Sequence, residues 1–292
     1  MNGKRKIVIF GATGKQGDAV ANAMLKSPDW AVTAVTRNTE SAAAQALRQA
    51  GALVEYADLQ NQTSVFEAVR GAYGVFAVTQ PWSAVDNKFN KEKEILQGKN
   101  IIWACREAGV NHVVFSSMFN FFNKPTGISF IDSKCILEEI IKTYTIRCTV
   151  LRCSLYMESL NIVRRQKNNI FKSNFADDLI LPYVALQDVG NAVSVVFNNY
   201  DLYKFRTIDL IGDLVTGKEI VALLNRKYQP DSFLHRPAGR LRQRILQPEI
   251  YKLRRYLEQV NQTPDIPEMR QAYERSLACF PFLTNMEDFL NR

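Results

Sequence analysis

The chain has 292 residues, of which 47% are apolar, 11% are aromatic and 23% are charged. This composition is typical of a globular protein with a large core, and it excludes a disordered, collagen-like or disulfide-dependent chain. The formal net charge is +8, from 37 Lys and Arg against 29 Asp and Glu. An anionic partner such as nucleic acid, a phosphorylated ligand or a membrane surface therefore has to be considered.

Cysteine and histidine usage argues against a metal site. The five cysteines include no C-x-x-C pair and the chain has only two histidines, so we expect no metal and reduced thiols in a reducing compartment. The apolar run at 7–10 ends at Gly11 and is too short for a signal-peptide core. No apolar stretch approaches the roughly 18 residues of a membrane span. We expect a soluble cytoplasmic protein without membrane contact, with the nucleus as a second compartment.

In chain order, short β-rich runs alternate with longer helical stretches through the first half. The predicted strands cover residues 7–10, 31–36, 53–57, 74–79, 112–117 and 148–152. The predicted helices between them cover 17–26, 40–50, 62–71, 88–108 and 133–143. Such alternation indicates βαβ units, whose right-handed crossovers place helices on both faces of a parallel sheet. We predict an α/β fold of the Rossmann type, with a doubly wound parallel sheet.

The alternation loosens after about residue 152. Further helices are predicted at 189–199, 218–228 and within 240–275, and short strands at 180–183 and 207–212. We therefore divide the chain into an NAD(P)-binding Rossmann domain, residues 1–152, and a smaller C-terminal α+β lobe, residues 153–292, with some elements returning to the Rossmann sheet. We expect this lobe to cover the carboxyl edge of the sheet, where open α/β sheets bind ligands.

The strongest local signal lies between the first predicted strand and the first predicted helix, where Gly11, Gly14 and Gly17 are spaced G-x-x-G-x-x-G. Glycines at such a junction permit a tight turn and let the main chain approach a pyrophosphate, while the helix N-terminus supplies N–H donors. We predict a dinucleotide here. One alternative is a glycine turn that only packs strand against helix. A nucleoside-triphosphate loop is disfavoured by Asp18, because that motif requires Lys and then Ser or Thr.

The end of the second predicted strand indicates which dinucleotide. Arg37, followed by Asn38, stands where an acid would bind the ribose hydroxyls of NAD. A guanidinium matches a 2′-phosphate, a carboxylate would repel it, and Lys15 adds a second cation. We predict NADP(H) in preference to NAD(H); the alternative is that Arg37 is a solvated charge at a strand end. Asp58 and Leu59, after the third strand, are placed to meet the adenine.

Several segments together carry a family resemblance. They are GATGKQG at 11–17, VTRN at 35–38, ADL at 57–59, VTQPW at 78–82, DSKCILEEII at 132–141, LRCSLYMESL at 151–160 and LPYVALQDVGNAV at 181–193. In this order and spacing the chain resembles the NmrA-like branch of the atypical short-chain dehydrogenases. The resemblance implies a Rossmann-type NAD(P)-binding domain with a smaller lobe over the nicotinamide end.

The resemblance also implies a set of cofactor-binding residues. Around the pyrophosphate they are Gly11, Ala12, Thr13, Gly14, Lys15, Gln16 and Gly17, and around the 2′-phosphate Arg37 and Asn38. Toward the ribose and the nicotinamide they are Thr79, Gln80, Pro81, Ser116 and Lys134. The nicotinamide ring would be covered by Tyr156, Met157, Glu158 and Ser159.

The chain departs from the ordinary short-chain dehydrogenases at the catalytic centre. Those enzymes place a proton-transferring Tyr four residues before the active-site Lys, and here that residue is Phe130, before Lys134. Ser116 and Ser117 stand where the third catalytic member would be, but a hydroxyl alone is a poor acid near neutral pH. Cys153 and Ser159 replace the Pro and Asn of the family pattern, which affects the geometry over the nicotinamide.

Two functions follow from a complete cofactor signature beside an incomplete catalytic one. The first is a redox-sensing regulatory protein that binds NADP(H) and controls a protein partner such as a transcription factor, as the resemblance implies. The second is an NADPH-dependent reductase similar to quinone oxidoreductases and isoflavone reductases, in which Lys134 serves the proton chemistry. Lys134 has a ribose-binding role under either function. A homodimer is a further option, because related folds often associate through long helices.

The positive charge is concentrated in one C-terminal segment. Residues 226–255 contain nine Lys or Arg and two acids, a local net charge of 9 − 2 = +7. No nucleic-acid-binding signature accompanies the segment, so direct nucleic-acid binding is disfavoured. A solvated helical face and a docking surface for an acidic protein partner remain as alternatives.

Overall fold

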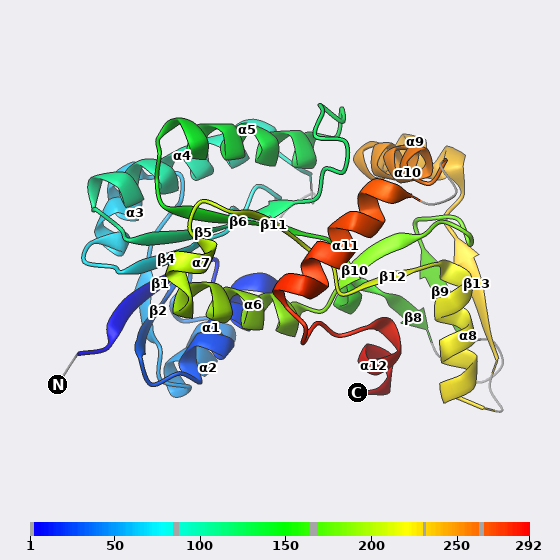
Figure 1. Cartoon of the computed structure of the whole chain (residues 1–292), viewed down its shortest axis with the longest axis horizontal. Helices are drawn as coiled ribbons and strands as arrows, with labels where there is room; N and C mark the ends of the chain where they lie inside the picture. Colours follow the sequence, from blue (N-terminus) through cyan, green and yellow to red (C-terminus); the bar gives the residue numbers. More distant parts are fainter. Residues whose placement is uncertain (1–2, 84–87, 164–168, 230–231, 263–265) are drawn as a thin grey trace. The chain divides into compact units, whose positions relative to one another are not determined.

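The computed structural model describes residues 3–83, 88–163, 169–229, 232–262 and 266–292. The chain divides into two units, each assembled from separate stretches (Figure 1). The first unit consists of Met1–Met118, Ser129–Arg152 and Val189–Ile208, and the second of Phe119–Ile128, Cys153–Asp188 and Asp209–Arg292. A division of the chain into two domains at residue 152 stays a prediction.

The first unit contains a seven-stranded sheet with flanking helices. Its strands are β1 (Arg5–Phe10), β2 (Trp30–Thr36), β3 (Leu53–Tyr56), β4 (Gly74–Ala77), β5 (His112–Met118), β6 (Cys148–Cys153) and β11 (Thr207–Leu210), in the order β11-β6-β5-β4-β1-β2-β3. β1 pairs in parallel with β2 and β4, and β4 in parallel with β5. The predicted Rossmann-type α/β fold is confirmed.

Helices connect these strands. They are α1 (Lys15–Leu25), α2 (Ala42–Gln49), α3 (Gln62–Val69), α4 (Lys91–Glu107), α5 (Ser129–Thr143), α6 (Leu186–Asn198) and α7 (Tyr200–Tyr203). Ser41, Asn61 and Asn90 cap the N-termini of α2, α3 and α4 by accepting a main-chain N–H bond. β1 reads as a continuous apolar run because it is central, and Ile7 through Phe10 are completely buried.

Several predicted boundaries were wrong by a few residues: α5 starts at Ser129 rather than at residue 133, and α6 at Leu186 rather than at residue 189. Two more lie near the carboxyl end of β4. The strand ends at Ala77 rather than at residue 79, and α4 starts at Lys91 rather than at residue 88. The chain leaves the ladder early because the Thr79 hydroxyl and the Gln80 main chain bond to side chains of α4. The later start of α4 is set by the Asn90 side chain, which accepts from Lys93 N at 2.7 Å.

The second unit contains two three-stranded sheets, β12-β10-β7 and β13-β9-β8. Its strands are β7 (Leu155–Tyr156), β8 (Asn161–Val163), β9 (Asn169–Ser173), β10 (Leu181–Val184), β12 (Asp213–Val215) and β13 (Phe233–Pro237). Its helices are the 3₁₀ turn η1 (Met157–Ser159), α8 (Gly217–Lys227), α9 (Arg240–Leu246), α10 (Pro248–Val260), α11 (Pro267–Cys279) and α12 (Met286–Asn291). The sheet β13-β9-β8 has no counterpart in the predicted elements, because its strands are too short and polar for a clear period-two pattern.

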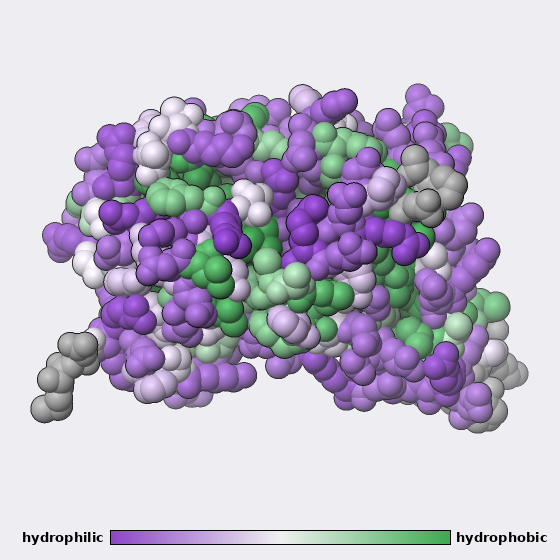
Figure 2. All heavy atoms as spheres, viewed as in Figure 1, coloured by the Kyte–Doolittle hydropathy of each residue, from purple (hydrophilic) through white to green (hydrophobic). Residues whose placement is uncertain are grey.

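On the face that Figure 2 shows, most residues are hydrophilic, with groups of hydrophobic residues among them. None of the helices in the described part of the chain combines the length and the apolar character that a bilayer crossing needs.

Candidate functional site

The junction of β1 and α1 is a turn that requires glycine. Gly11 has φ of +63°, and a Cβ there would lie 2.9 Å from Val78 Cγ1. A Cβ at Gly17 would lie 2.2 Å from the Gly11 carbonyl oxygen and 2.8 Å from Ala12 Cα. Gly14 N–H donates to the same Gly11 carbonyl at 2.8 Å, which closes the turn. The backbone of Gly11 and Ala12 lies too close to position 17 for any side chain there, so a steric constraint explains the glycine at this position.

This turn presents the N-terminus of α1. Gly14 is the N-cap, and the helical bonds begin with Asp18 N–H donating to Gly14 O at 2.8 Å. The N–H groups of Lys15, Gln16 and Gly17 therefore have no acceptor within the helix, and such donors favour an anion. An uncovered set of donors beside a turn with no room for a Cβ suits a pyrophosphate.

The loop is joined to the end of β2. Ala12 N–H donates to Val35 O at 3.2 Å, and the hydroxyls of Thr13 and Thr36 lie 3.1 Å apart. Arg37 follows directly and is exposed, with no hydrogen bond or ion pair to the described residues. Lys15 is exposed as well. Two cations thus border the glycine turn, and the guanidinium of Arg37 is not committed to another side chain of the described chain.

The remaining residues predicted at the adenosine side form turns. Asn38 Oδ1 accepts from Glu40 N at 3.1 Å, and Asp58 Oδ1 accepts from Gln60 N at 3.0 Å. Leu59, which is buried, accepts at its carbonyl oxygen from Asn100 Nδ2 at 2.8 Å. Asn38 and Asp58 shape the loops after β2 and β3, which explains these residue types without a ligand. Their contact with a cofactor stays a prediction.

Lys134 lies in a cluster of polar groups from three parts of the first unit. Its Nζ donates to Thr79 Oγ1 at 2.7 Å and to the Ser116 carbonyl at 3.0 Å, and it lies 3.0 Å from Glu94 Oε1. The side chain of Lys134 is 12% exposed and that of Glu94 is 2% exposed. An ammonium with so little exposure needs such a counter-charge, because an unpaired charge removed from water is costly.

Glu94 is the centre of this cluster. Its Oε1 accepts from Thr79 Oγ1 at 2.6 Å and its Oε2 from Ser133 Oγ at 2.5 Å. Each carboxylate oxygen therefore has at least one hydroxyl donor, besides the Lys134 ammonium. Together these groups form a compact charged network that carries protons on three of its members.

Sequence reasoning missed Glu94. The signal was its place on the inward face of α4, three residues before Gln97 and seven before Ile101, which are both buried. The close approach of α4 and α5 was also marked in the sequence, because Gly98 lies mid-helix. A Cβ there would lie 2.4 Å from the Leu137 methyl carbons. Gln97 Oε1 accepts from Gln80 N at 2.7 Å, which fixes the loop that carries Thr79.

Ser116 connects the Lys134 cluster to the glycine turn. Its hydroxyl donates to Gln16 Oε1 at 2.5 Å, while its carbonyl accepts from Lys134. Ser117 points to the opposite face of β5, as alternate strand residues do. Its hydroxyl donates to Glu138, which also accepts from Arg152. Of the two predicted serines, only Ser116 belongs to this side of the sheet. Ser116 thus joins Gln16, through its hydroxyl, to Lys134, through its carbonyl, and Lys134 in turn donates to Thr79.

Phe130 occupies the position of the usual proton-transferring Tyr and is buried, 8% exposed. Its ring lies 6.1 Å from that of Trp82 and 6.0 Å from that of Phe89. Pro81, which precedes Trp82, is buried too. The ring of Phe130 therefore packs in an apolar cluster one helical turn before Lys134, and it has no group that could exchange a proton.

The four residues predicted to cover the nicotinamide belong to the second unit. Glu158 Oε1 accepts from Leu186 N at 2.8 Å, Ser159 Oγ donates to Tyr156 O, and Met157 is completely buried. Burial and the neighbouring Cys153 thiol raise the pKa of Tyr156 well above its usual value, so it stays a neutral phenol. Leu186 belongs to the second unit, because α6 passes into the first unit only at Val189, so these contacts hold η1 within its own unit. A role over the nicotinamide stays a prediction.

No metal-binding group of His, Cys, Asp or Glu side chains occurs within the described ranges. His235, one of the two histidines, has its ring nitrogens within 2.6 Å of Asp177 Oδ1 and 2.8 Å of Ser173 Oγ, and it stacks on Phe171. This arrangement joins β13 to β9 and the loop after it.

The seven-stranded sheet, its flanking helices and the glycine turn at β1 define a Rossmann-type α/β protein. The chain belongs to the NmrA-like family, whose family model matches residues 3–289. The resemblance stated from the sequence is confirmed.

Fungal proteins named as oxidoreductases are similar to the chain. The NmrA-like family domain-containing oxidoreductase himF of Aspergillus japonicus is 38% identical over 114 residues, 38% of this chain and 33% of that protein. The match thus spans a third of the length of that relative. The similarly named notA of Aspergillus sp. (strain MF297-2) is 28% identical over 243 residues, 75% of this chain and 71% of that protein.

Solved structures share the fold at low identity. NmrA, a negative transcriptional regulator, has a TM-score of 0.78 at 15% identity and covers 98% of this chain and 94% of its own. NmrA has been solved with NADP and with NAD. The Citrobacter sp. triphenylmethane reductase complexed with NADP(H) has a TM-score of 0.74 at 19% identity and covers 99% of both chains. At such identities these likenesses show the fold alone.

Proposed function

We propose that this protein binds NADP(H) and acts as a redox-sensing regulator, controlling a protein partner such as a transcription factor according to which form of the cofactor it holds. The observation that supports the proposal is a tight glycine turn with open N–H donors at the start of α1, together with Phe130 at the position of the proton-transferring tyrosine. The glycine turn has no room for a Cβ at Gly17, while Phe130 replaces the tyrosine.

The residues present suit a pyridine dinucleotide. The pyrophosphate would be held by the N–H groups at the start of α1, and the 2′-phosphate by Arg37 with Lys15 nearby. Lys134, with Thr79 and Ser116, would hold the nicotinamide ribose. The nicotinamide supplies or accepts a hydride when it is bound. The exposed Arg37, with no acid beside it at the end of β2, supports NADP(H) over NAD(H).

The Lys134 cluster supports a sensor more than a catalyst. Lys134 is engaged by the buried Glu94, by the Thr79 hydroxyl and by the Ser116 carbonyl, so its ammonium is held by groups of the protein itself. A cofactor regulates such a protein only by binding two of its states with different affinity. Ser116 offers a physical connection, because it contacts both Gln16 in the glycine turn and Lys134.

An NADPH-dependent reductase is the second candidate function, and one observation favours it. Thr79, Glu94, Ser133 and Lys134 form a buried network that could return a proton to a reduced substrate. The oxidoreductase names of the fungal relatives and the NADPH-bound quinone oxidoreductase of Escherichia coli among the structural neighbours agree with this candidate.

One set of measurements separates the two functions. Calorimetric titration with NADPH, NADP, NADH and NAD should show tight binding of the phosphorylated forms, and a screen with quinones and aldehydes should show no NADPH consumption. Rapid NADPH oxidation with any of these acceptors overturns the regulatory proposal and supports the reductase.

The variant Lys134→Ala shows what Lys134 does if NADPH is consumed. Lost hydride transfer with cofactor affinity retained assigns the proton chemistry to Lys134, while lost affinity identifies a ribose ligand. Lys142→Ala is the matched control, because Lys142 lies on the same helix with its side chain 62% exposed.

A further inference from the structure

Helix α9 buries a polar side chain and exposes its large apolar side chains, which is the reverse of the usual arrangement. Its buried residue is Gln243, 1% exposed, whereas Leu241, Ile245 and Leu246 are 73%, 67% and 66% exposed. A surface helix ordinarily turns its apolar stripe to the core and its polar residues to water. Clustered exposure of large aliphatic side chains is a feature of interaction sites.

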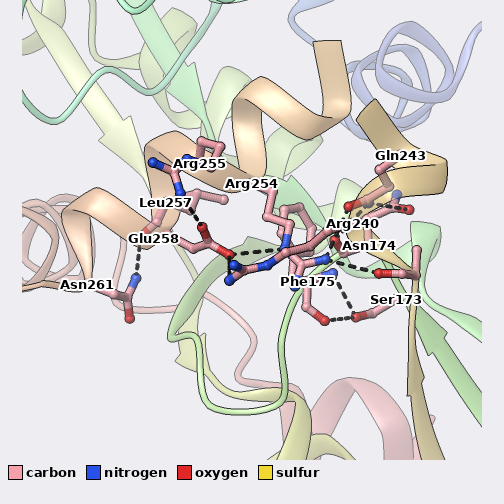
Figure 3. A network of polar contacts seen from close by, with 11 residues as sticks. Ser173, Asn174, Phe175, Arg240, Gln243, Arg254, Arg255, Leu257, Glu258 and Asn261 are labelled. Carbon is pink, nitrogen blue, oxygen red and sulfur yellow. Dashed lines mark hydrogen bonds and ion pairs between the residues drawn. The ribbon is translucent and has the colours of Figure 1, made fainter. Parts of the chain in front are cut away.

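Polar contacts, rather than apolar packing, hold this helix in the second unit. Gln243 Nε2 donates to Asn174 O at 2.8 Å, and its Oε1 accepts from Arg254 at 3.2 Å. Arg240 donates to Glu258 of α10 at 2.8 Å (Figure 3). The apolar residues of α9 are therefore not needed to attach the helix, and they remain available to a partner.

Arginines border the apolar stripe on both sides. Residues four apart lie on one line along a helix, so Arg240 and Arg244 flank Leu241 and Ile245 on one side, and Arg242 lies on the other. The sequence 240–246 contains no acid. No ion pair of Arg242 or Arg244 occurs among the described residues, and both side chains are exposed. The surface thus combines aliphatic contacts with unneutralised positive charge.

One arginine of α9 already pairs with a carboxylate of the protein, beside two arginines of α10. Glu258, a carboxylate 16% exposed, lies 2.8 Å from Arg240, 3.1 Å from Arg254 and 3.7 Å from Arg255 (Figure 3). Three guanidinium groups share this one carboxylate, which leaves a local excess of 3 − 1 = +2. Arg240 and Arg255 are 61% and 62% exposed and can meet further carboxylates.

We propose that this part of α9 is a docking surface for an acidic amphipathic segment of a protein partner. The α9 surface consists of Leu241 and Ile245 with Arg240, Arg242 and Arg244, and Leu246 extends the line of Arg242. Aliphatic residues of the partner would pack on the stripe, and its carboxylates would pair with the arginines. The inference rests on the proposed function in one respect, that the docked protein is the one regulated.

The surface fits nucleic acid and membranes less well. A phosphate backbone would meet the arginines but would leave the central aliphatic stripe against charged groups. Helices that lie in a membrane interface bury a broad apolar face, often over about 20–30 residues, whereas α9 has seven residues and a narrow stripe.

The test uses the full chain and a synthetic peptide. The peptide is a labelled helix-forming segment of Glu and Leu, with Leu at i, i+3, i+4 and i+7, and its control has the same composition in scrambled order. Fluorescence anisotropy should show binding of the amphipathic peptide, and the affinity for the scrambled peptide should be lower by about tenfold or more. Equal binding of both peptides overturns the proposal, because charge alone would then account for it.

Two variants assign the binding to α9. Leu241→Ser with Ile245→Ser should weaken it about tenfold or more, and Arg242→Glu with Arg244→Glu should weaken it similarly and reduce its salt dependence. The controls elsewhere are Leu202→Ser, which is 52% exposed, and the exposed Lys99→Glu, and both should bind the peptide as the wild type does. Unchanged binding by either α9 variant overturns the proposal. The proposal is also overturned if the protein co-sediments with phosphatidylserine vesicles with a higher affinity than it has for the peptide, and if the same variants lose this co-sedimentation.

Failure of this inference can be told from failure of the proposed function. Peptide binding is measured without cofactor and again with saturating NADPH or NADP, and cofactor affinity is measured separately. A peptide affinity that is the same in all three conditions contradicts regulation by the cofactor, while the docking surface stands. Tight cofactor binding without peptide binding contradicts the docking surface alone.

Discussion

The glycine turn and the Lys134 cluster both lie beside the same parallel sheet, but they are built from different kinds of groups. The turn is made of main chain: Gly11 and Gly17 matter because of the space that a Cβ would occupy. The cluster is made of side chains from α4, α5 and the loop after β4, gathered around Glu94. A main-chain site depends on a few consecutive residues, and a side-chain site depends on how helices pack.

The largest expected effect tests the cluster. Glu94→Gln keeps the shape of the side chain but removes the negative charge beside the buried Lys134 ammonium. Because an uncompensated buried charge remains, we expect the free energy of unfolding to fall by about 4 kcal/mol in urea denaturation. The exposed Glu139→Gln, on α5, should change it by less than about 0.5 kcal/mol.

A double variant shows whether charge is the reason. Glu94→Gln combined with Lys134→Met removes both members of the ion pair, so it should recover more than half of the stability that Glu94→Gln loses. If the double variant is as unstable as Glu94→Gln alone, the hydroxyl contacts of Thr79 and Ser133, and not the ion pair, hold the cluster together.

The next largest effect is the pH dependence of stability that His112 causes in the sheet carrying both regions. It defines the pH range in which the stabilities of variants in the two regions can be compared. His112 at the start of β5 is completely buried, and burial lowers its pKa from 6.5 to about 4. Its Nε2 lies 2.8 Å from Thr149 Oγ1, and its Nδ1 has no partner among the described residues. The unfolded chain therefore takes up a proton at His112 below pH 6.5, while the folded chain does so only near pH 4.

This difference contributes stability that is fully present above pH 6.5 and is lost as the pH falls to about 4, by about 3 kcal/mol in total. Urea denaturation of the wild type and of His112→Gln across this range isolates the contribution, since Gln can donate to Thr149 but does not titrate. Parallel curves for the two proteins would show that His112 is protonated equally in both states.

A somewhat smaller loss of stability tests the glycine turn. Gly17→Ala forces a methyl group to within 2.2 Å of the Gly11 carbonyl oxygen, so the turn has to open. We expect a loss of about 2 kcal/mol in thermal or urea denaturation and at least about tenfold weaker NADPH binding by calorimetry. Gly239→Ala is the control, because a Cβ there meets nothing within 4 Å. Unchanged NADPH affinity in Gly17→Ala would remove the turn from the cofactor site.

The smallest effect sharpens the cofactor choice. Arg37→Ser removes an exposed guanidinium with no partner in the described chain, so stability should not change. NADPH affinity should fall about tenfold, or about 1.4 kcal/mol, while NADH affinity stays the same. An equal loss for both cofactors, or none for either, would make Arg37 a solvated charge at the end of β2.

The glycine turn could be predicted from the sequence more completely than the Lys134 cluster. The physical reason is that the turn depends on consecutive residues, whereas the cluster depends on helix packing. The spacing of Gly11, Gly14 and Gly17 between a strand and a helix is a local pattern, and the structure places them in a turn that permits no side chain at position 17. Lys134 was identified only through the family resemblance, and its partner Glu94, 40 positions earlier, was not identified at all. The distance between them in the chain is closed by the packing of α4 on α5, where Gly98 meets Leu137.

The second unit shows the same limit. The helical period of residues 240–275 was predicted, and it became α9, α10 and α11. The short strands β8, β9 and β13 were not predicted, because such strands become regular only through pairing with each other. The basic character of 226–255 was visible in the composition, and within that segment Asp231 lies outside the described residues. Which arginines are neutralised, and that Leu241 and Ile245 face water, depends on the neighbours of α9.

The sequence by itself determined the order of strands and helices through residue 152, the glycine turn, the cation after β2 and the absence of a tyrosine at position 130. These are properties of consecutive residues and of their periodicity. Only the tertiary structure decided that Lys134 is paired with a buried glutamate, that Ser116 rather than Ser117 faces the glycine turn, and that α9 turns its aliphatic residues outward. Burial and pairing of charged groups depend on helices that meet far apart in the chain, and that information is not contained in any local pattern.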